Sequence, residues 1–110
     1  MNDLPLFIPL KSEFYAAFIA GTKLTEYRRH GPGWNAKTCQ VGRRVVLSKG
    51  YGKAHRVTGT IIAFTVSAEP TKTDAWRKCY GDASGEAACI TIRLDVIAGD
   101  WPDRSEVANG

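Results

Sequence analysis

The chain has 110 residues, of which 44% are hydrophobic and 24% are charged, with 15 Lys and Arg against 11 Asp and Glu. This length predicts one domain with a single core, and the composition excludes a largely disordered chain and a membrane-spanning segment. The net charge of +4 favours an anionic partner.

The first predicted elements are an edge strand and a helix. Residues 4–10 are apolar but include two prolines, which remove ladder donors and suit the edge of a sheet. Ser12 is the predicted N-cap of the helix that follows, in which apolar residues recur at four-residue spacing. Gly21 is predicted to end this helix.

The later elements follow from the same signals. In chain order they are a strand at 41–48, a glycine-rich hairpin loop at 49–53, a strand at 57–66, a helix capped by Thr73 and ended by Gly81, and a strand at 90–96. We expect Trp76, Cys79 and Tyr80, which share one face of the second helix, to pack inward. Residues 1–98 form the predicted domain, and residues 99–110 form a polar, flexible tail.

This order lacks the regular strand and helix alternation of a parallel sheet. We therefore predict an α+β fold, a small mixed β-barrel with two or three short helices at its mouth. Closure of the barrel removes sheet edges that so short a chain could hardly cover in another way.

The strongest functional signal lies at residues 21–29, where the first helix ends and a strand begins. In an extended strand Glu26 and Arg28 fall on one face, and Lys23 in the preceding turn can aim at the same point. Such a group suits acid–base chemistry and the orientation of an anion, because a desolvated lysine can lose its charge and act as a base. The alternative is an exposed ladder of ion pairs.

Three further residues near this segment are candidate substrate-binding groups. Arg29 extends the basic run, and Tyr15 and Trp34 offer rings on which a base can stack. Trp34 belongs to the loop at 30–35, which glycines and a proline keep irregular. The alternative for both aromatic residues is packing against the core.

The cysteines and histidines do not indicate a metal site. Three cysteines, odd in number and widely spaced, predict reduced, buried thiols rather than a disulfide framework. The two histidines lie far apart without a neighbouring Cys-x-x-Cys pair, so we expect no metal and no other cofactor. The amino terminus lacks the pattern of an export signal, and we expect a cytoplasmic location.

The segment Gly21-x-Lys23-x-x-Glu26-x-Arg28, preceded by an apolar strand and a helix, resembles the signature of the ASCH domain family, which are PUA-like barrels. The likeness extends over about residues 4–97. Members of this family are associated with RNA binding or processing, and some small bacterial members hydrolyse the acyl amide of N4-acetylcytidine.

In those hydrolases the catalytic set is a lysine of the motif, a threonine three residues later and a glutamate ahead of the second helix. Lys23 matches the lysine, and Glu69 is the best match for the glutamate. Glu26 stands at the threonine position, with Thr25 one residue early, and a one-residue offset on a strand turns a side chain to the opposite face. The sequence therefore departs from the pattern of these enzymes at the threonine position.

The resemblance implies a metal-free amidohydrolase that acts on N4-acylated cytidine or cytosine. Lys23 would activate water or the Thr25 hydroxyl, Glu26 or Glu69 would hold the lysine or move a proton, and Arg28 would anchor an oxygen. The alternative is an RNA-binding or RNA-cleaving module with a basic cleft. The expected partner is a small nucleoside or nucleobase, with RNA as the alternative, and the expected protein is a monomer or weak dimer.

Overall fold

The chain folds into one curved, mixed sheet with two α-helices. Its computed structural model describes residues 4–81 and 85–95, so the predicted tail at 99–110 lies outside the described residues. In chain order the elements are β1 (Leu6–Leu10), α1 (Ser12–Ala20), β2 (Thr25–Arg29), β3 (Arg44–Lys49), β4 (Arg56–Ser67), the 3-10 helix η1 (Glu69–Lys72), α2 (Asp74–Tyr80) and β5 (Ala87–Leu94).

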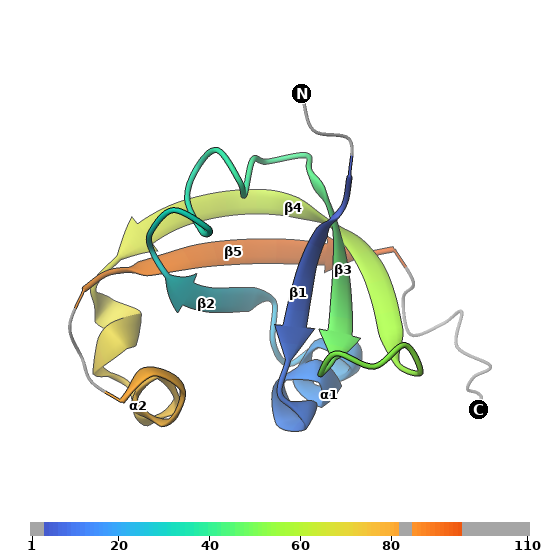
Figure 1. The fold of residues 1–110 in the computed structure, drawn as a ribbon, viewed down its shortest axis with the longest axis horizontal. Coiled ribbons are helices and arrows are strands. Elements are labelled where there is room, and N and C mark those ends of the chain that lie inside the picture. Colours follow the sequence, from blue (N-terminus) through green and yellow to red (C-terminus); the bar gives the residue numbers. More distant parts are fainter. Residues whose placement is uncertain (1–3, 82–84, 96–110) are drawn as a thin grey trace.

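The strands are arranged in the order β1-β3-β4-β5-β2. β1 runs parallel to β3, and every other neighbouring pair is antiparallel. Figure 1 shows the sheet arching above α1 and α2 in this view. Along β5, α1 packs on the face that carries Ile90 and Ile92, and α2 packs on the face that carries Ala87 and Cys89. No helix among the described residues is both long and apolar enough to cross a membrane.

The predicted closed barrel is a half-barrel in the described residues. β1 pairs only with β3, and β2 pairs only with β5, so these two strands remain the edges of an open sheet. The physical reason lies partly in β1, because Pro9 has no N–H to donate to a neighbouring strand. A side chain spans the opening instead: the Arg28 Nη2 on β2 donates to the Pro9 carbonyl oxygen on β1.

A bulge in β4 contributes to the curvature of the sheet. The register between β4 and β5 shifts between Ile61 and Ala63, which leaves an extra residue on β4. Such a residue bends its strand and increases the local twist. Alternate residues Val57, Gly59 and Ile61 are buried before the bulge, as the predicted strand requires.

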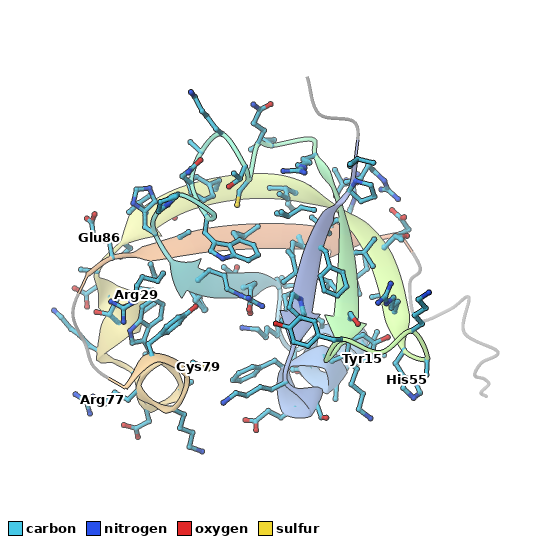
Figure 2. All side chains as sticks on the ribbon, viewed as in Figure 1. Tyr15, Arg29, His55, Arg77, Cys79 and Glu86 are labelled. Atoms are coloured by element: carbon cyan, nitrogen blue, oxygen red, sulfur yellow. The ribbon has the colours of Figure 1, made fainter. Side chains whose placement is uncertain are left out.

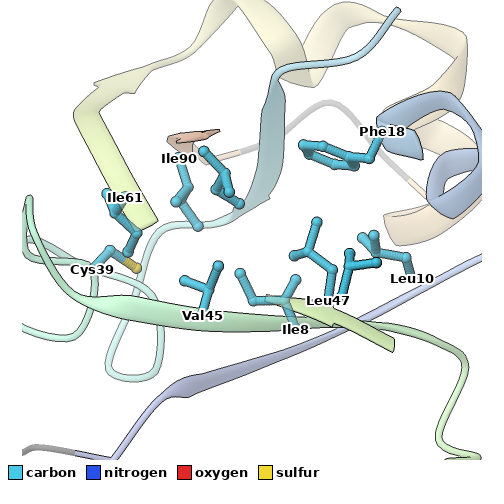
Figure 3. Close-up of a cluster of buried hydrophobic side chains, with 10 residues drawn as sticks. Ile8, Leu10, Phe18, Cys39, Val45, Leu47, Ile61 and Ile90 are labelled. Atoms are coloured by element: carbon cyan, nitrogen blue, oxygen red, sulfur yellow. The ribbon is translucent and has the colours of Figure 1, made fainter. Parts of the chain in front are cut away.

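The apolar residues form two clusters. The larger cluster lies between the sheet and α1 (Figure 3), and its buried members are Ile8, Leu10, Phe18, Cys39, Val45, Leu47, Val57, Ile61, Ile90 and Ile92. The smaller cluster joins α2 to β5 through Trp76, Ala87 and Cys89, with Tyr80 packed against it. The two clusters anchor α1 and α2 separately.

The helix ends agree with the sequence except at one cap. Gly21 and Gly81 end α1 and α2 in the left-handed conformation, with φ of 81° and 83°. Thr73 caps α2, because its side chain accepts a hydrogen bond from the Trp76 N–H. The predicted Ser12 cap is wrong: Ser12 is the first residue of α1, and Lys11 occupies the cap position without a side-chain bond.

The thiols agree with the prediction in part. The three cysteines are free, and Cys39 and Cys89 are buried. Cys79 is exposed, which corrects the expectation that it packs inward with Trp76 and Tyr80. α2 has only seven residues and rests on the sheet mainly through its aromatic side chains, so Cys79 lies at the margin of that face.

Gly59 is a position where the packing of β4 on β5 excludes a side chain. A Cβ atom at Gly59 would lie 2.6 Å from the Arg93 carbonyl oxygen and 3.0 Å from the Ile92 Cγ2. We expect Gly59→Ala to lower the free energy of unfolding by about 1–3 kcal/mol, the usual cost of overpacking. Denaturant unfolding measures this, with Gly52→Ala as control because nothing lies within 4 Å of a Cβ there. Equal losses for both variants would contradict the prediction.

Asp95 connects the ends of three strands and makes folding sensitive to acid. It accepts hydrogen bonds from Arg44 Nη1 at 2.8 Å and Thr58 Oγ1 at 2.5 Å. The hydrogen bond from Arg44, followed by that from Thr58, lowers the pKa of Asp95 from 3.8 to about 2. Because the pKa is lower in the folded state, this stabilisation is present above pH 3.8 and is lost as the pH falls towards about 2.

We therefore expect Asp95→Asn to be less stable than the wild type at neutral pH. The difference should shrink between pH 3.8 and about 2. Thermal unfolding measured across this range checks the prediction. A difference that is independent of pH would show that the carboxylate charge contributes nothing.

Candidate active site

Lys23, Glu26 and Arg28 converge as the sequence predicted. Glu26 is buried, and each oxygen of its carboxylate faces one cation: Oε1 lies 3.6 Å from Lys23 Nζ, and Oε2 accepts a hydrogen bond of 2.7 Å from Arg28 Nε. The Lys23 and Arg28 side chains are only 18% and 17% exposed. This burial excludes the alternative of an exposed ion-pair ladder. The charges of a sheltered group of this kind are also less screened by solvent.

Three aromatic rings surround the amine of Lys23. Its Nζ lies 5.3 Å from the ring centroid of Phe14, 5.5 Å from that of Phe18 and 5.0 Å from that of Tyr27. The faces of such rings attract a cation. With Glu26 they hold the ammonium group in a defined place between α1 and β2.

Arg28 is held on several sides at once. Besides its bonds to Glu26 and to the Pro9 carbonyl oxygen, its guanidinium carbon lies 4.8 Å from the ring centroid of Trp34. A guanidinium fixed in this manner presents its remaining N–H groups in a constant direction. Arg28 therefore links the two edges of the half-barrel and also lines the cavity described below.

A cavity of about 720 Å³ lies beside this ionic group, between α1 and α2. One wall carries Lys23, Glu26 and Arg28. The lining residues contributed by η1, α2 and its cap are Glu69, Pro70, Thr73, Ala75, Trp76, Cys79 and Tyr80. Its volume and mixture of apolar walls with a few charged groups are typical of small-molecule sites.

Glu69, the first residue of η1, also lines the cavity. Its side chain is 79% exposed and its Oε2 lies 3.3 Å from Lys72 Nζ. The structure thus brings the predicted lysine and the predicted later carboxylate to one cavity. They lie 46 positions apart in the sequence, and the fold alone brings them together.

Thr25 and Arg29 do not line the cavity, although both were predicted to belong to the site. The Thr25 hydroxyl lies 3.0 Å from that of Thr91 on β5, away from Lys23. The guanidinium of Arg29 lies 5.1 Å from the Tyr80 ring, and its backbone N–H donates to the Tyr80 hydroxyl. Figure 2 shows Arg29 beside α2. Strand alternation explains Thr25, which occupies the face opposite Glu26.

The two predicted stacking rings also lie outside the cavity. Trp34 and Tyr15 are partly buried and pack against the larger core cluster, which was the stated alternative for both. Burial raises the pKa of Tyr15 above its usual value. Neither ring is placed to stack on a ligand in this cavity.

The sequence analysis missed the aromatic wall that does line the cavity. Trp76 and Tyr80 form a tilted pair with ring centroids 4.3 Å apart, and Tyr27 and Tyr51 also contribute to the lining. Tyr51 is 80% exposed. In Figure 2 Cys79 lies on the flank of α2 that is nearer to α1. The four-residue spacing of Trp76 and Tyr80 was the available signal, but it indicates a buried face without showing what lies opposite.

The described residues contain no group of three His, Cys, Asp or Glu side chains arranged to hold a metal ion. The arrangement is instead one of two fixed cations, a buried carboxylate and a second, exposed carboxylate around an aromatic cavity. Such a set can orient a polar, planar ligand, stabilise negative charge that develops on an oxygen and move a proton.

No protein-family model matches the chain, and a search of curated proteins finds no match. Solved structures do match. The crystal structure of an ASCH protein from Zymomonas mobilis superposes with a TM-score of 0.56 at 16% identity, covering 79% of this chain and 65% of that chain. A tyrosine-to-phenylalanine mutant of the Zymomonas mobilis protein gives a TM-score of 0.55 at 15% identity, covering 94% of this chain and 81% of that chain. The chain thus spans about two thirds of the first of these structures.

Proposed function

We propose, starting from the ASCH-domain fold that the chain shares with these structures, that it is an amidohydrolase that cleaves the acyl amide of N4-acylated cytidine or cytosine without a metal. The observation that carries the proposal is the convergence of Lys23, Glu26 and Arg28 on a cavity of about 720 Å³ that Glu69 also lines. This volume lies within the range of about 300–1,000 Å³ of small-molecule pockets.

Lys23 and Arg28 would stabilise the transition state. Attack on the acyl carbon places negative charge on the acyl oxygen, and positioned donors lower the barrier to that step. The rings and the carboxylate around Lys23 favour the role of a cationic donor over that of a neutral base. Glu26 would act by holding both cations towards the acyl oxygen.

Glu69 would carry the proton. Its carboxylate takes a proton from water as the water oxygen bonds to the acyl carbon. When the tetrahedral intermediate collapses, the bond between the acyl carbon and N4 breaks and the proton passes from Glu69 to N4. The products are cytidine and the free carboxylic acid. Water is the nucleophile in this scheme, since the Thr25 hydroxyl bonds to Thr91 instead.

Incubation of the purified protein with N4-acetylcytidine tests the proposal, with cytidine release followed by chromatography. We expect release to persist in EDTA, and we expect Glu69→Gln to lower kcat about 100-fold or more, as loss of a general acid–base group does. Glu13→Gln is the matched control, because Glu13 is an exposed residue of α1 outside the cavity. The absence of cytidine release at high enzyme concentration would reject the proposal.

The second candidate function is RNA binding without chemistry. The observation that favours it is Glu26, which stands where the resembled hydrolases carry their threonine, together with the exposed ring of Tyr51 at the cavity. Binding to phosphates must weaken as salt increases, because counterions compete. A cytidine-containing RNA that binds equally well at low and moderate salt would contradict this candidate.

A further inference from the structure

We infer that Trp34 is a positioning residue that sets the placement of Lys23 through Arg28 and Glu26, although Trp34 does not touch the cavity. This inference rests on the proposed function, because it assigns Trp34 an effect on the same reaction. It replaces the sequence-based role of Trp34 as a ring that stacks on the substrate.

The first link is the contact between Trp34 and Arg28. The indole packs against the larger core cluster on one side and lies 4.8 Å from the Arg28 guanidinium carbon on the other. Reciprocal backbone hydrogen bonds with Gly31, at 3.1 and 3.2 Å, fix the loop that carries the ring. The Trp34 ring therefore holds the Arg28 guanidinium in place, and a rotation of the guanidinium away from the ring would remove a cation–π contact.

The second link is the carboxylate of Glu26. Arg28 Nε holds Oε2 at 2.7 Å, and the other oxygen, Oε1, lies 3.6 Å from Lys23 Nζ. Each oxygen faces a different cation, so a rotation of the carboxylate that follows a displaced Arg28 also moves Oε1 relative to Lys23. A change at Trp34 is thereby transmitted to an amine that it does not contact.

The kinetic test compares Trp34→Leu, which removes the aromatic face, with Trp34→Phe, which keeps a smaller one. We expect kcat for N4-acetylcytidine to fall about tenfold in Trp34→Leu, with KM within about twofold of the wild type, and most of the loss to be recovered in Trp34→Phe. A rise in KM with unchanged kcat would overturn the inference by showing direct contact with substrate. Unchanged kinetics in Trp34→Leu would overturn it as well.

A second readout does not depend on hydrolysis. The rate at which an amine-acylating reagent labels Lys23, mapped by mass spectrometry and divided by that of the exposed Lys37, reports how firmly the amine is held. We expect this ratio to rise about fivefold in Trp34→Leu, with Glu26→Gln as the positive control. An unchanged ratio in Trp34→Leu, beside a raised one in Glu26→Gln, would overturn the inference.

The two readouts separate the failure of this inference from that of the proposed function. A wild-type protein that releases no cytidine, together with the expected change in labelling, would reject the hydrolase and support the link from Trp34 to Lys23. An active wild type whose Trp34 variants keep normal kinetics and labelling would support the hydrolase and reject the link from Trp34 to Lys23. Trp34→Phe retains most of the packing, so its intermediate labelling value decides the question if Trp34→Leu unfolds.

Discussion

Replacing Lys23 with methionine is expected to lower kcat for N4-acetylcytidine by about a thousandfold, the effect of removing a donor to a developing oxyanion. Methionine keeps an apolar stem against Phe14, Phe18 and Tyr27 but removes the ammonium group. Because the Glu26 carboxylate also keeps its hydrogen bond from Arg28, the free energy of unfolding should fall by only about 1 kcal/mol, less than in a variant that removes this carboxylate. Steady-state kinetics and thermal unfolding of the same preparation give both values.

The matched control for this change is Lys37→Met, because Lys37 is an exposed lysine in the loop before β3. We expect Lys37→Met to leave both kcat and the free energy of unfolding unchanged. If Lys23→Met retained most of the activity, the assignment of Lys23 as the oxyanion donor would be wrong. If it unfolded the protein, Lys23 would be a structural residue.

Replacing Glu26 with glutamine is expected to damage both stability and activity. The change leaves the cations of Lys23 and Arg28 facing a neutral amide, with side chains that are only 18% and 17% exposed. Removing one partner from such a buried group costs about 3 kcal/mol or more. We expect this loss in denaturant unfolding, and a fall in kcat of about 100-fold because the two donors lose their common support.

Glu69→Gln provides the contrast, since its carboxylate is 79% exposed and pairs with Lys72 at the surface. The free energy of unfolding of this variant should change by no more than about 0.5 kcal/mol, while its activity falls. The Glu26→Gln and Glu69→Gln variants are thus predicted to differ in their free energy of unfolding, although both changes lower the activity. A stable Glu26→Gln protein would show that the carboxylate contributes little to the fold.

The ionic group also explains why the opening of the half-barrel matters for the site. Arg28 bonds to Glu26 on its own strand and to the Pro9 carbonyl oxygen across the opening, so one side chain serves both the fold and the cavity wall. A lysine at this position could not make both contacts in a fixed plane. Arg28 therefore links the two edge strands beside the cavity.

The sequence predicted the local part of the site well, because its spacing depends only on the geometry of a strand. Lys23, Glu26 and Arg28 are near neighbours in the chain, so the alternation of β2 and the turn after Gly21 were sufficient to bring them together. The caps at Gly21, Thr73 and Gly81 are likewise local features. Glu69 was identified only through the resemblance to a family.

The sequence could not predict which aromatic residues face the ligand cavity. Trp34 and Tyr15 were predicted either to stack on a base or to pack against the core, and Trp76 and Tyr80 were predicted to pack inward. Only the packing of separate elements shows which of these rings line the cavity. Trp34 contacts Arg28 and does not line the cavity, whereas Trp76 and Tyr80 do line it. Periodicity defines a face of an element but carries no information about what that face contacts.

The sequence by itself indicated the order of the strands and helices and the ionic group of β2, because hydrophobic periodicity, turn residues and the alternation of a strand are local patterns. Only the tertiary structure decided that the sheet stays open, that Thr25 faces Thr91 and that Glu69 and Lys23 line one cavity. These features depend on the register of distant strands and on the anchoring of α1 and α2 in separate clusters. Such long-range contacts arise from packing, which no local pattern specifies.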